Sequence, residues 1–454
     1  MILKTKMAGQ VYAFKNLTDV LAKANDEKSG DVLLGRAAST VTERTAARMV
    51  LSRATLEDIY ENPVLPPEKD EVSRVLKEDL SLGIYRRVKG WTVGELRNWL
   101  LSHETGGEDI LRISRGLEAE AAAAVAKIMT AMDLVYAASK IKVPSTCATT
   151  IGLPGTLSFR NQPNHPADDL KGIIASLAEG VSYGSGDAVF GVNPVEDTVD
   201  NTKAILDALW DFMQRHEIPT QNCVLAHVTT QMQAVEKGAR ACCLFQSLAG
   251  TQLANDGFGV NAAILREAYD CIHTLGQAPG PNLLYFETGQ GSEQSIDADG
   301  GVDLMTLEAR CYGLARVFKP FMLNNVSGFI GPETLYDGRQ ILRATLEDHF
   351  MGKLLGIPMG MAPCYTNHTK INQDDQEMAT MLAAMAGANY YMGVPVGDDV
   401  MLAYQDTSFH DDAALREILG LTPAPEFFEW LKKRELMDEK GRLTAKAGDA
   451  SLFL

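Results

Sequence analysis

Two kinds of hydrophobic pattern follow one another along the chain and change over near residue 140. Before that point, apolar positions recur at helical spacing, and the capping-box sequences TVTE (40–43) and TVGE (92–95) each open such a segment. The alanine-rich stretch 117–139 carries the same spacing without a visible break and predicts one long helix. We therefore expect residues 1–140 to form an N-terminal helical region.

From about residue 146, short apolar runs alternate with amphipathic stretches that are long enough for a helix. Eight such runs occur, at residues 147–160, 187–195, 222–230, 242–250, 282–292, 321–331, 354–366 and 387–399. Strands that alternate with helices pair in parallel, and eight such units close into a barrel. The pattern therefore predicts an α/β fold, a (β/α)8 TIM barrel over residues 141–410, followed by closing helices and a tail over residues 411–454.

An open, doubly wound sheet is the alternative fold for alternating strands and helices. Such a sheet usually carries a glycine-rich turn that binds phosphate, and neither G-x-G-x-x-G nor G-x-x-x-x-G-K-S/T occurs in this chain. The missing turn favours the barrel.

Composition narrows the classes of partner. The formal net charge of −17 and the absence of a basic run argue against nucleic acid, whose phosphates call for lysine and arginine. Seven scattered cysteines without a C-x-x-C pair predict reduced thiols rather than a disulfide framework or a zinc site. No apolar stretch is long enough for a signal peptide or a membrane span. We expect a cytoplasmic protein that binds neither nucleic acid nor membrane.

Polar residues follow the predicted strands at the end where a (β/α)8 barrel carries its chemistry. In strand order they are Arg160 and Gln162; Asn193; His227 and Thr229; Gln246 and Ser247; Glu287 and Gln290; Asn324 and Asn325; Cys364 and Thr366; Asp398 and Asp399. One carboxylate, one guanidinium and several amides then meet at one mouth. Such a set is suited to a small, polar, cationic or hydroxylated ligand held by hydrogen bonds.

Each of these residues also has a structural interpretation. Glu287 can simply pair with Arg160, and the three amides Gln162, Asn193 and Gln246 can cap helices or turns. His227 fits a satisfied core residue, His349 fits helix packing, and the pair Asp398–Asp399 fits a solvated loop or a helix cap. Glu287 and His227 together are too few ligands for a divalent metal, so we expect no metal bound by protein side chains.

Motifs along the whole chain resemble the large subunit of ethanolamine ammonia-lyase. They are DVLAKANDEKSGD (19–31), TTIGLPGTLSFRNQPN, GDAVFGVNPV, CVLAHVTTQ, FQSLAG, YFETGQGS, GFIGPE, LEDHFMGKL, CYTNH, DDVMLAYQ and AGDASLFL. The resemblance implies a (β/α)8 barrel, in agreement with the strand count. It also implies a carbon–nitrogen lyase that uses adenosylcobalamin and radical chemistry to convert ethanolamine to acetaldehyde and ammonia.

The resemblance also implies roles for particular residues. Four residues would contact the substrate. Arg160, Asn193 and Glu287 would lie at its hydroxyl, and Gln162 with Glu287 would lie at its amine. Four further positions would touch the cobalamin: Pro194, Gln246, Ser295 and Met401. A separate small subunit would complete the enzyme, large subunits would associate with one another, and the site of action would be the cytosol or a bacterial microcompartment.

The chain departs from the family pattern at one position. The family reads Met-Gly-Cys-Asp before CYTNH, with the aspartate at the substrate amine, whereas this chain has Met361 and Ala362 in the last two places. Either Glu287 alone carries the ammonium of ethanolamine, or the pocket takes another vicinal amino alcohol. Two other interpretations stay open, a metal-dependent barrel lyase or aldolase, which a chelator would inhibit, and a non-catalytic paralogue that only binds partners.

Overall fold

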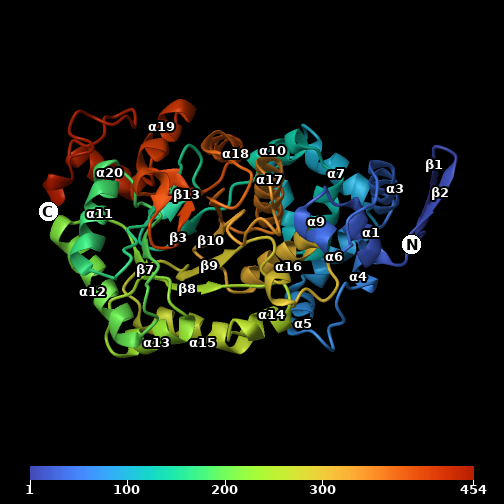
Figure 1. The fold of residues 1–454 in the computed structure, drawn as a ribbon, viewed down its shortest axis with the longest axis horizontal. Helices are drawn as coiled ribbons and strands as arrows, with labels where there is room; N and C mark the ends of the chain where they lie inside the picture. Colours follow the sequence, from blue (N-terminus) through green and yellow to red (C-terminus); the bar gives the residue numbers. More distant parts are fainter.

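The computed structural model describes all of residues 1–454 and shows eight parallel strands arranged as a barrel (Figure 1). In chain order they are β5 (Ser158–Asn161), β6 (Val189–Val192), β7 (Asn222–Val224), β8 (Leu244–Ser247), β9 (Leu284–Thr288), β10 (Met322–Asn325), β11 (Met359–Met361) and β13 (Tyr390–Val394). Their spatial order is β7-β6-β5-β13-β11-β10-β9-β8, and the amide of Cys243 donates to the carbonyl of Asn222 where the two ends of the sheet meet. Each predicted run contains one of these strands, so the barrel is confirmed.

Helices follow the strands and cover the outside of the barrel (Figure 1). They are α11 (Leu170–Ser182), α12 (Val199–His216), α13 (Val228–Glu236), α14 (Gln252–Gly257), α15 (Ala262–Leu275), α16 (Leu304–Val317), α17 (Gly338–Leu354), α18 (Gln373–Met385) and α19 (Phe409–Leu419). Most begin at a residue whose side chain accepts a hydrogen bond from the first turn, such as Asp169 before α11 or Thr198 before α12. The sequence therefore sets where each strand-to-helix loop stops.

Short elements decorate the barrel. The hairpin β3 (Ser145–Thr146) and β4 (Thr150–Ile151) precedes the first barrel strand, and β16 (Thr407–Ser408) pairs in parallel with the end of β13. A three-stranded sheet, β12 (Tyr365–Thr366), β14 (Asp398–Asp399) and β15 (Tyr404–Gln405), follows β11 and β13. It therefore lies beyond the carboxyl ends of two barrel strands, where the fold places a functional site.

The N-terminal region is mostly helical, but it opens with a hairpin that the hydrophobic pattern did not predict. The hairpin is β1 (Lys4–Met7) and β2 (Gln10–Ala13), and Figure 1 shows it projecting at one end of the molecule. The helices are α1 (Leu17–Ala24), α2 (Ser29–Leu33), α3 (Val41–Leu51), α4 (Leu56–Glu61), α5 (Glu71–Asp79), α6 (Leu82–Val88), α7 (Val93–Leu101), α8 (Gly107–Ser114), α9 (Ala119–Lys127) and α10 (Ala131–Lys140).

The single long helix predicted over residues 117–139 is wrong. The segment is two helices, α9 and α10, because Thr130 starts a new helix with a capping box that includes Asp133. The last residue of α9, Lys127, is completely buried and forms an ion pair with Asp303 at 2.6 Å. The ion pair of Lys127 and the strong N-cap at Thr130 therefore end one helix and begin the next, although the apolar spacing is continuous.

The C-terminal segment packs back onto the barrel. After α19 come α20 (Pro425–Lys433) and the short 3-10 turn Ala450–Phe453. Phe453 is 2% exposed, and its ring lies against those of Phe212 and Trp430. The end of the chain is therefore held by the body of the protein.

One hydrophobic core of 103 buried residues extends from Phe14 to Phe453 and includes the N-terminal helices, the barrel and the C-terminal segment. The division of the chain at residues 140 and 410 stays a prediction. None of the helices combines the length and the apolar character that a membrane crossing requires.

Candidate functional site

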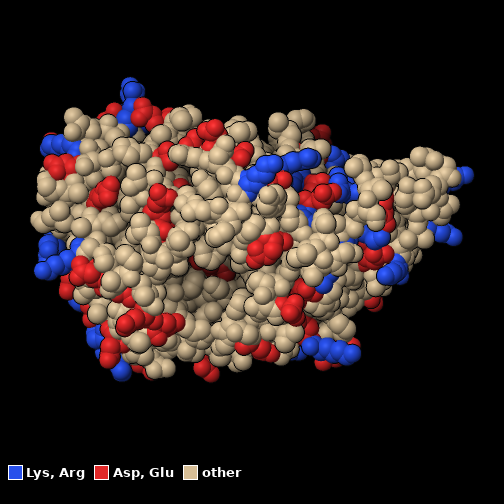
Figure 2. All heavy atoms as spheres, in the orientation of Figure 1, with Lys and Arg blue, Asp and Glu red and all other residues tan.

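A cavity of about 510 Å³ lies at the carboxyl ends of the barrel strands. In Figure 2 the surface is hollowed over β7 to β9, and acidic atoms lie at the upper edge of the hollow. Seven polar lining residues come from four strands and the residues just after them: Arg160, Gln162, Asn193, Gln246, Ser247, Glu287 and Thr288. The lining also includes Asp197, His227, Ser292, Ser295 and Tyr404, so the fold brings together residues that are far apart in the sequence.

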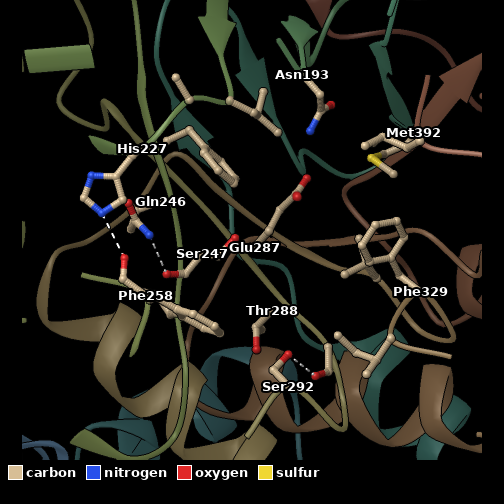
Figure 3. A pocket seen from close by; sticks show the side chains of 18 of the residues that line it. Asn193, His227, Gln246, Ser247, Phe258, Glu287, Thr288, Ser292, Phe329 and Met392 are labelled. Carbon is tan, nitrogen blue, oxygen red and sulfur yellow. Dashed lines mark hydrogen bonds between the residues drawn. The ribbon is translucent and has the colours of Figure 1, made fainter. Parts of the chain in front are cut away.

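Glu287 is the residue around which the polar side of the cavity is built. Its Oε1 accepts hydrogen bonds from Arg160 Nη1 at 2.8 Å, from Asn324 Nδ2 at 3.3 Å and from the Tyr285 hydroxyl. Its Oε2 has no protein donor, and the side chain is 14% exposed. Figure 3 shows the carboxylate pointing into the cavity toward Asn193. One oxygen is therefore fixed by the protein, and the other is free to bind a ligand.

Arg160 holds that carboxylate from the opposite side of the barrel. It is 1% exposed, and it donates from Nη1 to the Tyr285 hydroxyl at 2.7 Å and from Nη2 to Asn193 Oδ1 at 2.8 Å. Burial opposes the charge of Arg160, but the oxygens of Tyr285 and Glu287 outweigh burial and raise the pKa of the guanidinium above its ordinary value. Gly191 makes room for it, since a Cβ there would lie 2.6 Å from Arg160 Nε.

Gln162 presents an acceptor to the cavity. Its Nε2 donates to Asp399 Oδ2 at 2.6 Å and to the Tyr404 hydroxyl at 2.8 Å. Its Oε1 is buried and has no hydrogen-bond partner within the protein. A buried carbonyl oxygen without a donor is costly, so this atom is suited to a ligand that donates.

Asn193 presents a donor instead. Its Oδ1 accepts from Arg160 and its backbone amide donates to Asn164 Oδ1 at 2.8 Å, whereas its Nδ2 has no protein partner. Among Glu287, Gln162 and Asn193 the cavity therefore offers two acceptors, Glu287 Oε2 and Gln162 Oε1, together with one amide donor. A small molecule with a cationic amine and a neighbouring hydroxyl complements that set.

The remaining walls are mostly apolar. They consist of Leu225, Ala226, Phe245, Leu248, Phe258, Val326, Phe329, Ile330, Met392 and Leu402. Figure 3 shows Phe258 and Phe329 on opposite sides of Glu287. Such walls exclude water from the polar groups and strengthen their interactions with a ligand.

The structure brings six of the eight residues implied by the resemblance to the cavity. Gln246 and Ser295 line it together with the four substrate positions, Arg160, Gln162, Asn193 and Glu287. Pro194 and Met401 do not line it, although each is next in sequence to a residue that does, Asn193 and Leu402. Their predicted contact with a cofactor stays a prediction.

Several strand-end residues turn away from the cavity, against the expectation that the whole set meets at one mouth. Thr229, Asn325, Cys364, Thr366 and Asp398 do not line the cavity. Asn324 does not line it either, but its amide donates to two residues that do, Glu287 and Met392. Gln290 and Asn325 instead donate to the buried carboxylate of Asp348, at 2.7 and 3.0 Å. Adjacent positions after a strand face opposite sides, so nearness in sequence does not select the residues at the mouth.

The two histidines have structural roles. His227 caps α13, with Nδ1 against the Thr229 hydroxyl at 2.7 Å and Nε2 against the carbonyl of Phe258 at 2.9 Å. His349 is completely buried within α17. His349 agrees with the packing role interpreted from the sequence. The ring nitrogens of His227 are bonded, as expected, but the residue is only partly buried and lines the cavity rather than the core.

Comparison with known proteins identifies the family. Residues 12–446 match the family model described as ethanolamine ammonia lyase large subunit (EutB). The chain is 51% identical over 453 residues to the ethanolamine ammonia-lyase large subunits of Salmonella typhimurium (strain LT2) and Escherichia coli (strain K12), and each match covers 100% of both chains. This chain belongs to the ethanolamine ammonia-lyase large subunit family. The predicted enzyme class, a carbon–nitrogen lyase, is confirmed with it.

Ala362, where the resemblance implies an aspartate, lies behind the apolar wall of the cavity. It is completely buried and clusters with Cys364, Met392 and Tyr404, and the partly buried Val326, Phe329 and Leu402 pack against this cluster. Neither Ala362 nor Met361 lines the cavity. On this side the structure places methyl, thioether and ring atoms and no carboxylate lining the cavity.

Three residues have a larger part in the site than the pattern along the chain indicated. Asp399 is 3% exposed and accepts from Gln162 Nε2, so it is part of the site rather than a solvated loop residue. Tyr285 and Tyr404 bind Glu287 and Gln162 through their hydroxyls. A signal existed for Tyr285, because residues two apart in a strand share a face. The strand-end pattern included Asp399 but did not distinguish it from Asp398, and no pattern along the chain marks Tyr404.

The buried carboxyl of Asp406, two residues after Tyr404, makes stability depend on pH. Asp406 is 5% exposed, and its Oδ2 has no partner. Burial raises its pKa to about 8, from 3.8 for the free residue. The folded protein therefore keeps a proton that the unfolded chain has lost. The stabilising effect of this proton on the folded state is complete below about pH 4 and is lost as the pH rises to about 8.

Replacing Asp406 by asparagine removes this dependence. We expect Asp406→Asn to stabilise the protein by roughly 2–4 kcal/mol more at pH 8 than at pH 5, since one unit of pKa shift corresponds to about 1.4 kcal/mol. Urea unfolding at the two pH values measures the difference. Asp200→Asn, at a side chain that is 92% exposed, is the control. Equal effects of Asp406→Asn at both pH values would show that Asp406 is ionised in the folded protein.

Proposed function

We propose that this chain is the large subunit of an adenosylcobalamin-dependent radical lyase that deaminates ethanolamine to acetaldehyde and ammonia. One observation carries the proposal. In a largely apolar cavity, the free Oε2 of Glu287, the unpartnered Oε1 of Gln162 and the free amide nitrogen of Asn193 form two acceptors and a donor for one small molecule. The relatives that share half of the sequence are named for ethanolamine.

The polar groups divide between the two ends of such a substrate. The ammonium would donate to Glu287 Oε2 and Gln162 Oε1, and the negative charge of Glu287 would favour the protonated amine. The hydroxyl would accept from Asn193 Nδ2, and Arg160 would act mainly by holding Asn193 and Glu287 in place. Binding at both ends fixes the carbon between them in one orientation, which is what a reaction at a defined C–H bond requires.

The donor set of the cavity fits a cobalamin at its open end. Gln246 and Ser295 would hold the corrin there, with Pro194 and Met401 beside them. His227 is the one histidine in the cavity lining, and both of its ring nitrogens are already bonded, so it would not serve as a ligand to cobalt. When bound, adenosylcobalamin supplies an adenosyl radical that takes hydrogen from the carbinol carbon.

The protein's own task is then to hold the substrate and to keep water and stray hydrogen donors out. The apolar wall of Phe245, Phe258, Phe329 and Met392 serves the second purpose. By the same reasoning from the family, we propose a small subunit as partner, association between large subunits, and action in the cytosol or in a bacterial microcompartment.

The test is reconstitution. The chain is purified together with a small subunit, adenosylcobalamin is added, and ethanolamine and its C-methylated analogues are assayed for aldehyde and ammonia. We expect equal amounts of both products, dependence on the cofactor and no effect of a chelator. Inhibition by the chelator with no need for cobalamin would indicate a metal-dependent lyase. No product from any amino alcohol would indicate a non-catalytic paralogue.

A further inference from the structure

The amide of Gln162 has one orientation, and Asp399 determines it. The side-chain amide has a donor end and an acceptor end, and its donor end faces Asp399 Oδ2 at 2.6 Å. An ionised carboxylate only accepts hydrogen bonds. The reverse orientation would set Gln162 Oε1 against a carboxylate oxygen at hydrogen-bond distance, which is repulsive. Oε1 is therefore the end of the amide that is left for a ligand, and it has no protein donor, in a residue that lines the cavity.

Asp399 is itself held in one position. Its Oδ1 accepts the backbone amides of Met401 at 3.0 Å and Leu402 at 2.7 Å, and its Oδ2 accepts Asn164 Nδ2 at 2.7 Å as well as Gln162. It is 3% exposed and pairs with no lysine or arginine. Four N–H donors thus hold the carboxylate. Oδ1 binds the backbone of the loop at Met401 and Leu402, and Oδ2 binds the side-chain amides of Gln162 and Asn164.

The orientation matters because it leaves the cavity lining with a second free acceptor in addition to that of Glu287. Gln162 Oε1 and Glu287 Oε2 are both acceptors without a protein donor. An ammonium has three hydrogens and can satisfy both acceptors, whereas a hydroxyl has one hydrogen and leaves one acceptor unpaired. A site built for a donor rejects the analogue that lacks it, because its own buried polar group then stays unpaired.

We propose that Asp399 is a positioning residue that makes the cavity select an amine over a hydroxyl, by locking the Gln162 amide with its oxygen toward the ligand. The inference rests on the proposed function, since it concerns how an amino alcohol is distinguished from a vicinal diol of the same size. Asp399 touches neither end of the substrate and acts only through Gln162.

Asp399→Asn tests this directly. Oδ1 of the new side chain keeps the two backbone amides, so its NH2 group replaces Oδ2 and faces the donor ends of Gln162 and Asn164. Gln162 then turns over, and its NH2 faces the cavity. We expect the dissociation constant of ethanolamine to rise at least about tenfold, while that of 1,2-ethanediol changes less than about threefold. Calorimetric titration of the two-subunit complex without cofactor measures both.

A second variant separates positioning from a merely structural role. In Asp399→Asn combined with Gln162→Glu, the new carboxylate accepts from the asparagine NH2 with one oxygen and offers the other to the ligand. The exchange keeps the net charge, and we expect it to restore the preference for ethanolamine to within about threefold of wild type. Asp398→Asn, the same change at the exposed neighbouring residue, should leave both dissociation constants unchanged.

The outcomes are distinct. Wild-type complex that binds no amino alcohol overturns the proposed function and this inference with it. Wild-type complex that prefers ethanolamine, with Asp399→Asn folded and keeping that preference, overturns the role of Asp399 alone. Should the single variant fail to fold, the double variant decides: if it is folded and lacks the preference, Asp399 does not act through the Gln162 amide.

Discussion

Replacing Glu287 by glutamine is expected to lower turnover of ethanolamine at least about tenfold and kcat/KM on the order of 10²-fold. Oε2 becomes an NH2 group that opposes the substrate ammonium, and Arg160 loses the carboxylate it pairs with at 2.8 Å. Removing one partner of a buried ion pair typically costs roughly 3–5 kcal/mol, and about 1.4 kcal/mol corresponds to a tenfold change in binding. Steady-state kinetics of the reconstituted enzyme, with aldehyde as the product measured, give both constants.

The Glu287→Gln result needs a variant that changes an acid without touching the cavity. Glu236 at the end of α13 is exposed and does not line the cavity, so Glu236→Gln should have wild-type kinetics. Thermal unfolding of both variants shows whether the fold tolerates the loss of the ion pair between Arg160 and Glu287. A folded Glu287→Gln enzyme with wild-type kcat and KM would mean that the amine binds elsewhere.

The barrel could be predicted because its signal is local. Each strand of the barrel is a short apolar run, and each following helix begins at a capping residue that is visible in the sequence. The same local reasoning found Glu287, since a carboxylate directly after Leu284, Tyr285 and Phe286 needs a partner. It failed at residues 117–139, where the continuous apolar spacing was given more weight than the capping box Thr130–Asp133. The second cause of the break, the buried ion pair of Lys127 with Asp303, joins positions 176 apart.

The couplings within the site could not be predicted for the same reason. Arg160 reaches Glu287 across 127 positions and Gln162 reaches Asp399 across 237. Residue types at strand ends indicate that polar groups gather there, but which atom faces which depends on side-chain directions fixed by packing. Asp399 shows this well. By pattern it is one of two adjacent aspartates in a loop, and in the structure one is exposed and the other is buried against an amide.

Ala362→Asp should tighten the binding of ethanolamine at least about tenfold and weaken the protein without ligand. In the empty protein the new carboxylate would lie among Cys364, Met392 and Tyr404, which are at most 2% exposed, without a cation. A substrate ammonium would supply that cation, and breaking such a buried pair typically costs roughly 3–5 kcal/mol. Thermal unfolding at increasing ethanolamine concentration should show a lower starting Tm and a larger rise than wild type.

Ala362→Asn separates charge from shape in that experiment, because asparagine has the same size and no charge. It should lower the starting Tm less and should leave ethanolamine binding within about threefold of wild type. If folded Ala362→Asp binds ethanolamine no better than wild type, the departure from the family at this position is compensated elsewhere in the site.

The same variant decides between the two substrate interpretations. With Ala362, the wall of the cavity on this side is made of Val326, Phe329, Met392 and Leu402, and a methyl group on the substrate would contact it favourably. If the pocket is adapted to a larger amino alcohol, kcat/KM of the wild-type enzyme is higher for 1-amino-2-propanol or 2-amino-1-propanol than for ethanolamine, and Ala362→Asp reverses that order. If Glu287 alone carries the ammonium of ethanolamine, ethanolamine is the better substrate of both enzymes, and the substitution increases only the affinity.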